Sequence, residues 1–409
     1  MELIIWLGLL FSGGYYYSII SVGSSLVLPI LAILTVILLF VSRESGFRLG
    51  TRLEALNKNR FVLFVLLSIT IIIPGLANGN IGTLEIKYIL IIACSFLIAG
   101  RYSFSRFKFM FVRVMFIVAI LAILGYFVLM SPLINIFPYI TNYNGVEYVN
   151  GIFFSAIKYT YSGITNRVQG IFWEPGLFAT YMAIAVFFVE KDMFERTRNY
   201  WIILITLIVS LILSRSGAGI IMIALLIMIK IFDHKTGVKT VYSVLSFIIY
   251  GLLIFAFFST SDSFNSWINQ YLISKVGDSS NVSNLTRMNS IYLDLFLFAN
   301  KFPFGTGLSL YSYEVSLFKN LFPSSCTSTL TTFLASLGLF GIPLFTFWIK
   351  GILRLTKGNG FIAKIGIILL LLVMITKEPH GNLLIMNCLI AYFNFSSDDS
   401  LNLCSNYLG

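Results

Sequence analysis

The sequence predicts an all-α protein, a polytopic transmembrane bundle of about 12 helices, and two observations support this. First, 58% of the 409 residues are hydrophobic and only 11% are charged, which gives a mean hydropathy of +0.90. A soluble protein carries about 25% charged residues because its surface must stay hydrated. Second, the apolar residues form runs long enough to cross roughly 30 Å of hydrocarbon. We therefore expect one integral membrane domain over 1–409.

The candidate spans follow one another along the chain. They are 2–20, 22–41, 61–78, 84–100, 112–131, 174–189, 200–214, 217–232, 241–259, 327–349, 362–377 and 381–395. Only Arg215-Ser216 separates two of them, which predicts either a tight turn at the membrane surface or a broken, re-entrant element. Irregular backbone within a bilayer is tolerated only where it lines a polar cavity.

Basic residues set the expected orientation. Most of the 28 Lys and Arg residues fall in loops on one side of the twelve-span arrangement, namely 42–60, 101–113, 190–199, 230–240 and 350–364. The positive-inside rule makes that side cytoplasmic, with both termini there. The same placement explains the net charge of +11, so we expect no nucleic-acid partner and expect the lipid bilayer as the surrounding medium.

Two sizeable segments, 132–173 and 260–326, then lie outside the membrane. Neither has the strand alternation or the cysteine framework of an independent domain. Within the second, residues 285–300 have helical spacing and predict a short helix lying on the membrane.

Three arginines on the external side lie close to a span: Arg167, Arg215 and Arg287. The planar fork of donors in arginine suits phosphate and stays charged when partly desolvated. The Arg215 turn also begins a helix, where backbone N–H groups favour anions. These residues predict a pocket for a lipid-linked diphosphate. The alternative is that each arginine extends to the headgroups or pairs with a nearby carboxylate.

Glu174 and His380 are the candidate catalytic residues. Glu174 starts a span before Pro175, so it is either a helix N-terminal acid or a carboxylate that pairs with Arg167 or contacts substrate. His380 lies in a sharp, charged break at 377–382, where a neutral imidazole could accept a proton from a sugar hydroxyl; the alternative is a structural role. No nucleotide or metal motif is present, so no cofactor and no metal are expected.

Four short motifs follow one another between about 160 and 345. They are the Arg167…Gly170…Glu174-Pro175-Gly176 segment, the Ser214-Arg215-Ser216-Gly217 turn, the Arg287 helix followed by Pro303-Phe304-Gly305-Thr306-Gly307, and Ser325-Cys326-Thr327-Ser328 ahead of Leu334-Ala335-Ser336-Leu337-Gly338. With these motifs and its hydropathy, the chain resembles the O-antigen polymerase (Wzy) family, within the superfamily that also contains the O-antigen ligases.

The resemblance implies a GT-C-like, metal-independent glycosyltransferase of the bacterial inner membrane, with its active site facing the periplasm. Its substrate would be an undecaprenyl-diphosphate-linked oligosaccharide, and 132–173 and 260–326 would be periplasmic loops. A membrane protein that regulates chain length is a candidate partner. The O-antigen ligases share a histidine just before the Leu-Ala-x-x-Gly helix. Here Cys326-Thr327-Ser328 stands instead, which favours a polymerase of lipopolysaccharide or other surface polysaccharide.

The implied roles follow from these positions. Arg215 and Arg287 would hold the diphosphate, Arg167 would assist them or position Glu174, and His380 or Glu174 would orient or deprotonate the acceptor sugar. Two alternatives stay open: a ligase that transfers glycan to lipid A–core, and a flippase for the same lipid-linked sugar. A flippase predicts charges near the bilayer midplane, and the centres of the predicted spans are almost free of charge.

Overall fold

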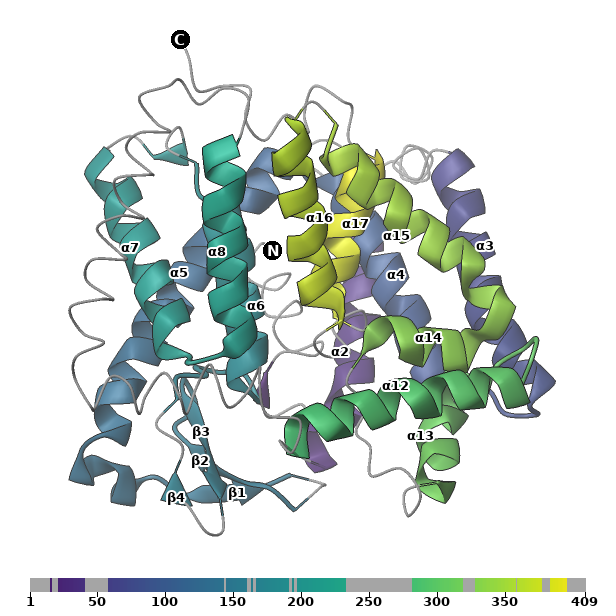
Figure 1. Cartoon of the computed structure of the whole chain (residues 1–409), viewed down its shortest axis with the longest axis horizontal. Helices are drawn as coiled ribbons and strands as arrows, with labels where there is room; N and C mark the ends of the chain where they lie inside the picture. The colour runs from purple at the N-terminus through teal and green to yellow at the C-terminus, as the bar shows by residue number, and fades with distance from the viewer. Residues whose placement is uncertain are drawn as a thin grey trace.

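The computed structural model describes residues 15–16, 21–40, 58–142, 145–159, 163–164, 167–190, 193–194, 197–232, 282–318, 328–357, 359–376 and 383–395. This part of the chain is mostly helical. Its long helices stand side by side as a bundle, with a small sheet and a crossing helix at one end (Figure 1). The predicted run 241–259 lies outside the described residues, as does nearly all of 2–20.

Every other predicted run corresponds to a helix in the bundle. The helices are α2 (Ser21–Phe40), α3 (Lys58–Ala77), α4 (Thr83–Arg101), α5 (Phe104–Leu129), α6 (Pro175–Phe188), α7 (Thr197–Leu213), α8 (Gly217–Phe232), α14 (Thr329–Leu337) continued by the 3-10 turn η6 (Gly338–Gly341) and α15 (Ile342–Leu355), α16 (Phe361–Thr376) and α17 (Leu384–Phe395). Most ends of these helices were therefore predicted to within a few residues.

Four helices of the described chain are long and apolar enough to cross a membrane by length and composition: Lys58–Ala77, Thr83–Arg101, Phe104–Leu129 and Thr329–Leu355. The remaining apolar helices, such as Pro175–Phe188, are shorter. Large apolar side chains such as Ile117 and Phe127 point outward from the bundle. A lipid-facing surface is expected to look like this, so the helices indicate a membrane protein.

Helices α6 and α17 form the centre of the bundle. Almost all of their side chains are buried, and α17 packs against α4 and α15 while α6 packs against α5, α7 and α8. A helix that is apolar all round is stable only when other helices surround it. These two helices fix the positions of the outer ones, including the α7–α8 pair that carries Arg215.

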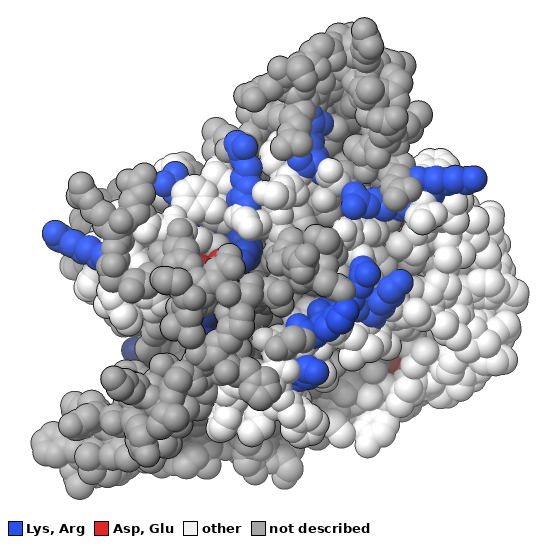
Figure 2. Space-filling view, turned by 90° about the horizontal axis from the view of Figure 1, so that it is seen from above, with Lys and Arg blue, Asp and Glu red and all other residues white. Residues whose placement is uncertain are grey.

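Lys and Arg gather at one end of the bundle, the end viewed from above in Figure 2. We call this surface the basic face. Here α4 leads into α5, α6 into α7 and α15 into α16, as the basic segments 101–113, 190–199 and 350–364 predicted. Its described cations are Lys58, Arg60, Arg101, Arg106, Arg113, Arg198, Lys230, Lys350, Arg354, Lys357 and Lys364. The described parts of 101–113, 190–199 and 350–364 therefore lie at one end of the bundle, as predicted, whereas 42–57 and 233–240 lie outside the described residues.

The opposite end carries a four-stranded antiparallel sheet, and the all-α expectation is wrong there. After the 3-10 turn η3 (Pro132–Ile136), the strands β1 (Tyr139–Thr141), β2 (Glu147–Asn150), β3 (Ser155–Tyr159) and β4 (Gly163–Ile164) pair in the order β1-β2-β3-β4. Strands this short contain too few residues to show a two-residue period in the sequence. The sheet rests on a small core of its own, made by Ile134, Val149, Phe154 and Ala156.

The helix predicted at 285–300 is confirmed as α12 (Val282–Asn300). It crosses the bundle at the sheet end and packs on α14, with the short helix α13 (Leu308–Leu317) below it (Figure 1). Between α12 and α13, Thr306 N–H donates to the Ala335 carbonyl at 2.9 Å. Gly305 has a φ of +74°, and a Cβ there would lie 2.6 Å from the nitrogen of Gly338. The glycine at position 305 therefore allows the segment between α12 and α13 to contact the backbone of Gly338.

Candidate functional site

Arg167 lies against the C-terminal end of α7. Its Nε donates to the carbonyl of Ser214 at 3.2 Å, and Val168 N–H donates to the carbonyl of Leu213 at 3.1 Å. Arg215 follows Ser214 directly in the chain. Arg167 therefore contacts the turn that contains Arg215, although the two arginines are far apart in sequence.

The α7–α8 connection is a tight turn, as one of the two predicted alternatives required. Helix α7 ends at Leu213 and α8 begins at Gly217. Arg215 has a φ of +48°, a left-handed conformation that a residue other than glycine adopts at a cost. Ser216 caps α8, since its hydroxyl accepts from Gly219 N–H at 3.4 Å. Among the described residues, a Cβ on Gly217 would meet no atom within 4 Å, so these residues leave space beside the start of α8.

A buried hydrogen-bond cluster fixes the backbone that carries Arg167. Ser155 on β3 donates its N–H to the Gly170 carbonyl at 2.7 Å, and Gln169 Nε2 donates to the Ser155 hydroxyl at 2.8 Å. Gly170 has a φ of +54°, and a Cβ there would lie 3.2 Å from the Cβ of Ala122. Strand β3 of the sheet therefore holds the 167–172 segment against α7.

Glu174 occupies the N-cap position of α6, with Pro175 in the first turn, as predicted. Its backbone is extended (φ −150°, ψ 152°), and its side chain makes no capping hydrogen bond to the helix. Phe178 N–H donates instead to the backbone carbonyl of Glu174, at 3.2 Å. The residue is half-buried and one of its carboxylate oxygens is buried, seven positions after Arg167 in the chain. Its position fits both roles considered for it.

Arg287 belongs to α12, whose backbone is described there. It precedes Asp294 by seven residues, or about two helical turns, so both positions fall on one side of the helix. Ser290 and Asp294 are buried, so the side of α12 that contains these two residues packs on the protein. His380 lies outside the described residues, between α16 and α17.

Two lysines of the segments predicted to be external have carboxylate partners. Lys158 pairs with Glu147 at 2.9 Å, which raises the pKa of the lysine, and Lys301 pairs with Glu314 at 2.7 Å. Local pairing with a carboxylate, the alternative considered for the arginines, is thus observed at these two lysines. They serve as matched controls for the arginines.

Sequence reasoning missed two buried acids near this end. Asp294 accepts from Tyr311 Oη at 2.5 Å and from Thr331 Oγ1 at 2.6 Å, while burial raises the pKa of its carboxyl. Glu85 is fully buried and accepts from Ser309 N–H at 2.9 Å. Each is the only acidic residue of its helix, which is the signal in the sequence that could have identified it. Both join α12 or α13 to the helices beneath them.

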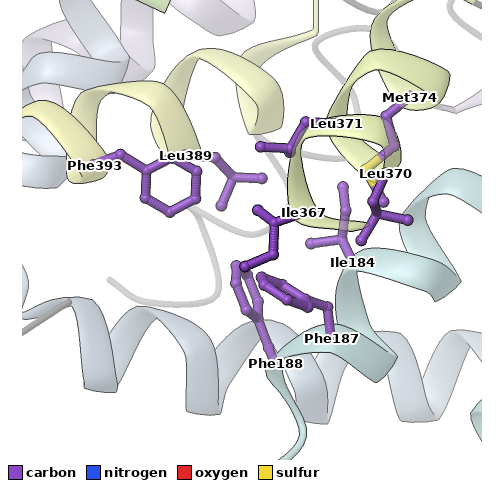
Figure 3. Close-up of a pocket in the computed structure, with 9 residues that line it drawn as sticks. All are labelled: Ile184, Phe187, Phe188, Ile367, Leu370, Leu371, Met374, Leu389 and Phe393. Carbon is purple, nitrogen blue, oxygen red and sulfur yellow. The ribbon is translucent and has the colours of Figure 1, made fainter. Parts of the chain in front are cut away.

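The apolar crevice in Figure 3 lies elsewhere, between α6, α16 and α17. Its lining is wholly apolar: Ile184, Phe187, Phe188, Ile367, Leu370, Leu371, Met374, Leu389 and Phe393. It offers no group for acid–base chemistry or for holding a phosphate. Among the described residues, no group of three or more His, Cys, Asp or Glu side chains could hold a metal ion.

No family model, no curated protein and no solved structure matches the chain. The functional argument therefore depends on the site itself.

Proposed function

We propose that this chain is a polyprenyl-diphosphate-dependent glycosyltransferase that joins lipid-linked oligosaccharide repeat units into a surface polysaccharide. The observation that carries the proposal is the hydrogen bond from Arg167 Nε to the Ser214 carbonyl, which brings Arg167 beside Arg215. A turn that contains Arg215 and accepts a hydrogen bond from Arg167, next to the N-terminus of α8, suits a diphosphate. Arg287 on α12 is the third proposed contact.

The proposed reaction is one displacement. A hydroxyl oxygen of the acceptor sugar attacks the anomeric carbon of the donor, and the bond from that carbon to the diphosphate oxygen breaks. The hydroxyl proton goes to Glu174 or to His380, and the polyprenyl diphosphate leaves with the bonding electron pair. Attack opposite the leaving group inverts the anomeric centre. The arginines stabilise the negative charge that grows on the diphosphate, which is the largest contribution expected from such a site.

The distribution of charge supports the proposed orientation. The turn between α7 and α8, which contains Arg215 and which Arg167 contacts, lies at the sheet end of the bundle, opposite the basic face (Figure 1). Under the positive-inside rule the basic face is cytoplasmic, so the site faces the periplasm of the inner membrane. With the two predicted runs outside the described residues, the bundle would have about 12 spans. The loops 132–173 and 260–326 would then cover the site from the periplasm.

The test measures polymerisation by membranes that contain the protein, with a synthetic undecaprenyl-diphosphate-linked repeat unit as donor and acceptor. Arg215→Ala should lower the initial rate by about a hundredfold or more, as the loss of one preorganised charge contact does. Arg215→Lys should retain part of the rate, since the charge remains and the fork of donors is lost. Lys158→Ala, which removes the ion pair with Glu147, should leave the rate unchanged.

Three results would count against the proposal. Equal rates for Arg215→Ala and the wild type would remove the diphosphate role. Transfer to lipid A–core, with no transfer to a second repeat unit, would identify a ligase. Movement of the lipid-linked unit between leaflets without any new glycosidic bond would identify a flippase. A chain-length regulator, if it is a partner, should change the length distribution and leave the dependence on Arg215 intact.

A further inference from the structure

A second site lies at the basic face, on the lipid-facing side of the bundle. A groove of about 350 Å³ runs between α5 and α7. It is lined by Arg113, Phe116, Ile117, Phe194, Asn199, Ile202 and Ile203. It is separate from the proposed active site, which is at the opposite ends of the same helices.

The two helices contribute the same pattern. Helix α5 supplies Arg113 and then the apolar residues at positions +3 and +4, and α7 supplies Asn199 and then the apolar residues at +3 and +4. Residues at this spacing form one stripe along a helix. Because both helices run away from the basic face, each stripe begins with a polar group and continues with apolar ones. The groove therefore has a polar mouth and an apolar floor.

The depth of the polar mouth matches the edge of a bilayer. At 1.5 Å per residue, α5 extends roughly 24 Å from Arg113 to Leu129, and α7 extends roughly 21 Å from Asn199 to Leu213. The hydrocarbon layer is about 30 Å thick. With Leu129 and Leu213 taken as the far edge of this layer, Arg113 would lie a few ångströms inside the near edge, within reach of the headgroups for a long side chain.

An aromatic pair holds the guanidinium at this place. Arg113 lies over the ring of Phe109, 4.2 Å from its centroid, and Phe109 contacts Phe194, with 6.4 Å between the ring centroids. Arg106, one heptad earlier on α5, and Arg198, next to Asn199, are both exposed. The positive charge around the mouth favours a ligand with net negative charge.

We propose that this groove binds an anionic phospholipid from the leaflet at the basic face. Its phosphate contacts Arg113 and Asn199, and one acyl chain lies between Phe116 and Ile117 on α5 and Ile202 and Ile203 on α7. The lipid would fill the space between two helices that both pack on α6 and would stabilise their spacing. This proposal does not depend on the glycosyltransferase reaction.

Native mass spectrometry of the full chain, with phosphatidylglycerol or phosphatidylcholine added to the detergent, tests the proposal. The wild type should retain one phosphatidylglycerol molecule at lower lipid concentration than phosphatidylcholine. Arg113→Ala should weaken phosphatidylglycerol binding by about tenfold, as expected for a lost charge-assisted contact. Ile117→Trp should weaken it too, because the indole fills the groove; Ile117 is 57% exposed, so this substitution leaves the core intact.

The matched control is Arg60→Ala. Arg60 also belongs to the basic face and also lies over an aromatic ring, that of Phe395 at 4.6 Å, but it is on α3. The Arg60→Ala variant should bind phosphatidylglycerol as tightly as the wild type does. Equal losses in Arg113→Ala and Arg60→Ala would show general surface attraction and overturn the site. The site would also be overturned if Ile117→Trp bound phosphatidylglycerol as tightly as the wild type does. The same holds if the wild type retained the two lipids equally.

Discussion

Glu85 on α4 accepts two hydrogen bonds from Ser309, the second residue of α13: one from the backbone N–H at 2.9 Å and one from the hydroxyl. The N–H of Gly82 also donates to this carboxylate, at 3.0 Å. A fully buried carboxylate with three donors ties the starts of two helices together, although the two residues are 224 positions apart. This contact anchors the external layer of α12 and α13 to the bundle.

Replacing Glu85 by Ala should destabilise the fold strongly. Three half-buried donors would lose their acceptor, so the free energy of unfolding should fall by about 3 kcal/mol. Thermal unfolding of the purified chain in detergent measures this. Glu147→Ala is the control, because Glu147 belongs to an exposed ion pair with Lys158, which is expected to contribute less than about 1 kcal/mol. Similar losses in both variants would contradict the structural role of Glu85.

Gly170 should be intolerant of alanine for two reasons. Its φ of +54° is unfavourable for any residue with a Cβ, and that Cβ would crowd Ala122 and Phe178 at 3.2 Å. Gly145 separates the two causes, because it has a φ of +78° with nothing within 4 Å. Gly145→Ala should lose about 1 kcal/mol of stability from strain alone, and Gly170→Ala should lose more. Equal thermal shifts would show that the crowding is relieved at no cost.

Arg215 should show opposite effects on stability and activity. Its φ of +48° disfavours a side chain, so Arg215→Gly should be more stable than Arg215→Ala by about 1 kcal/mol. Both variants should lose polymerisation, since both lack the guanidinium. Ile152, with a φ of +61°, provides the comparison: Ile152→Gly should gain stability over Ile152→Ala while the rate is unchanged. An active Arg215→Gly variant would show that the left-handed arginine is not kept for its side chain.

Asp294 should make stability depend on pH. Burial raises the pKa of its carboxyl above the ordinary value of 3.8, so folding favours the protonated form. Its contribution is fully present below the unfolded pKa and is lost as pH rises through the folded one. Asn does not titrate. Between about pH 4 and pH 7, the melting temperature of Asp294→Asn should therefore rise relative to the wild type. A constant difference would show that the hydrogen bonds from Tyr311 and Thr331 cancel the effect of burial.

Arg167 and Arg215 should act as one unit if they hold the same diphosphate. The combined Arg167→Ala and Arg215→Ala variant should then lose less rate than the product of the two single losses. Arg167→Ala with Lys158→Ala gives the reference, because Lys158 pairs with Glu147 and the two losses should simply multiply. Initial polymerisation rates in membranes provide both comparisons. Independent losses for the two arginines would indicate separate binding positions.

Predictions of helix position from the sequence agreed with the structure where they depended only on local hydropathy and on residues that start a helix. The run 217–232 agrees with α8 at both ends, and the Pro175 start of α6 was read from Glu174-Pro175. The short strands β1 to β4 were missed because they contain two to five residues each. Their stability comes from pairing and from the hydrogen bonds of Ser155, neither of which leaves a periodic pattern. Glu85 and Asp294 were missed because their partners lie on other elements.

The sequence by itself determined that apolar helices build this protein and that their basic ends share one face, because hydropathy and charge are properties of each segment alone. Only the tertiary structure decided that Arg167 meets the Arg215 turn, that Arg113 opens a lipid-sized groove, and that a sheet supports the 167–172 segment. Those contacts join residues far apart in the chain. They exist because packing around α6 and α17 brings the ends of separate helices together. A local sequence pattern does not specify which helix ends will meet.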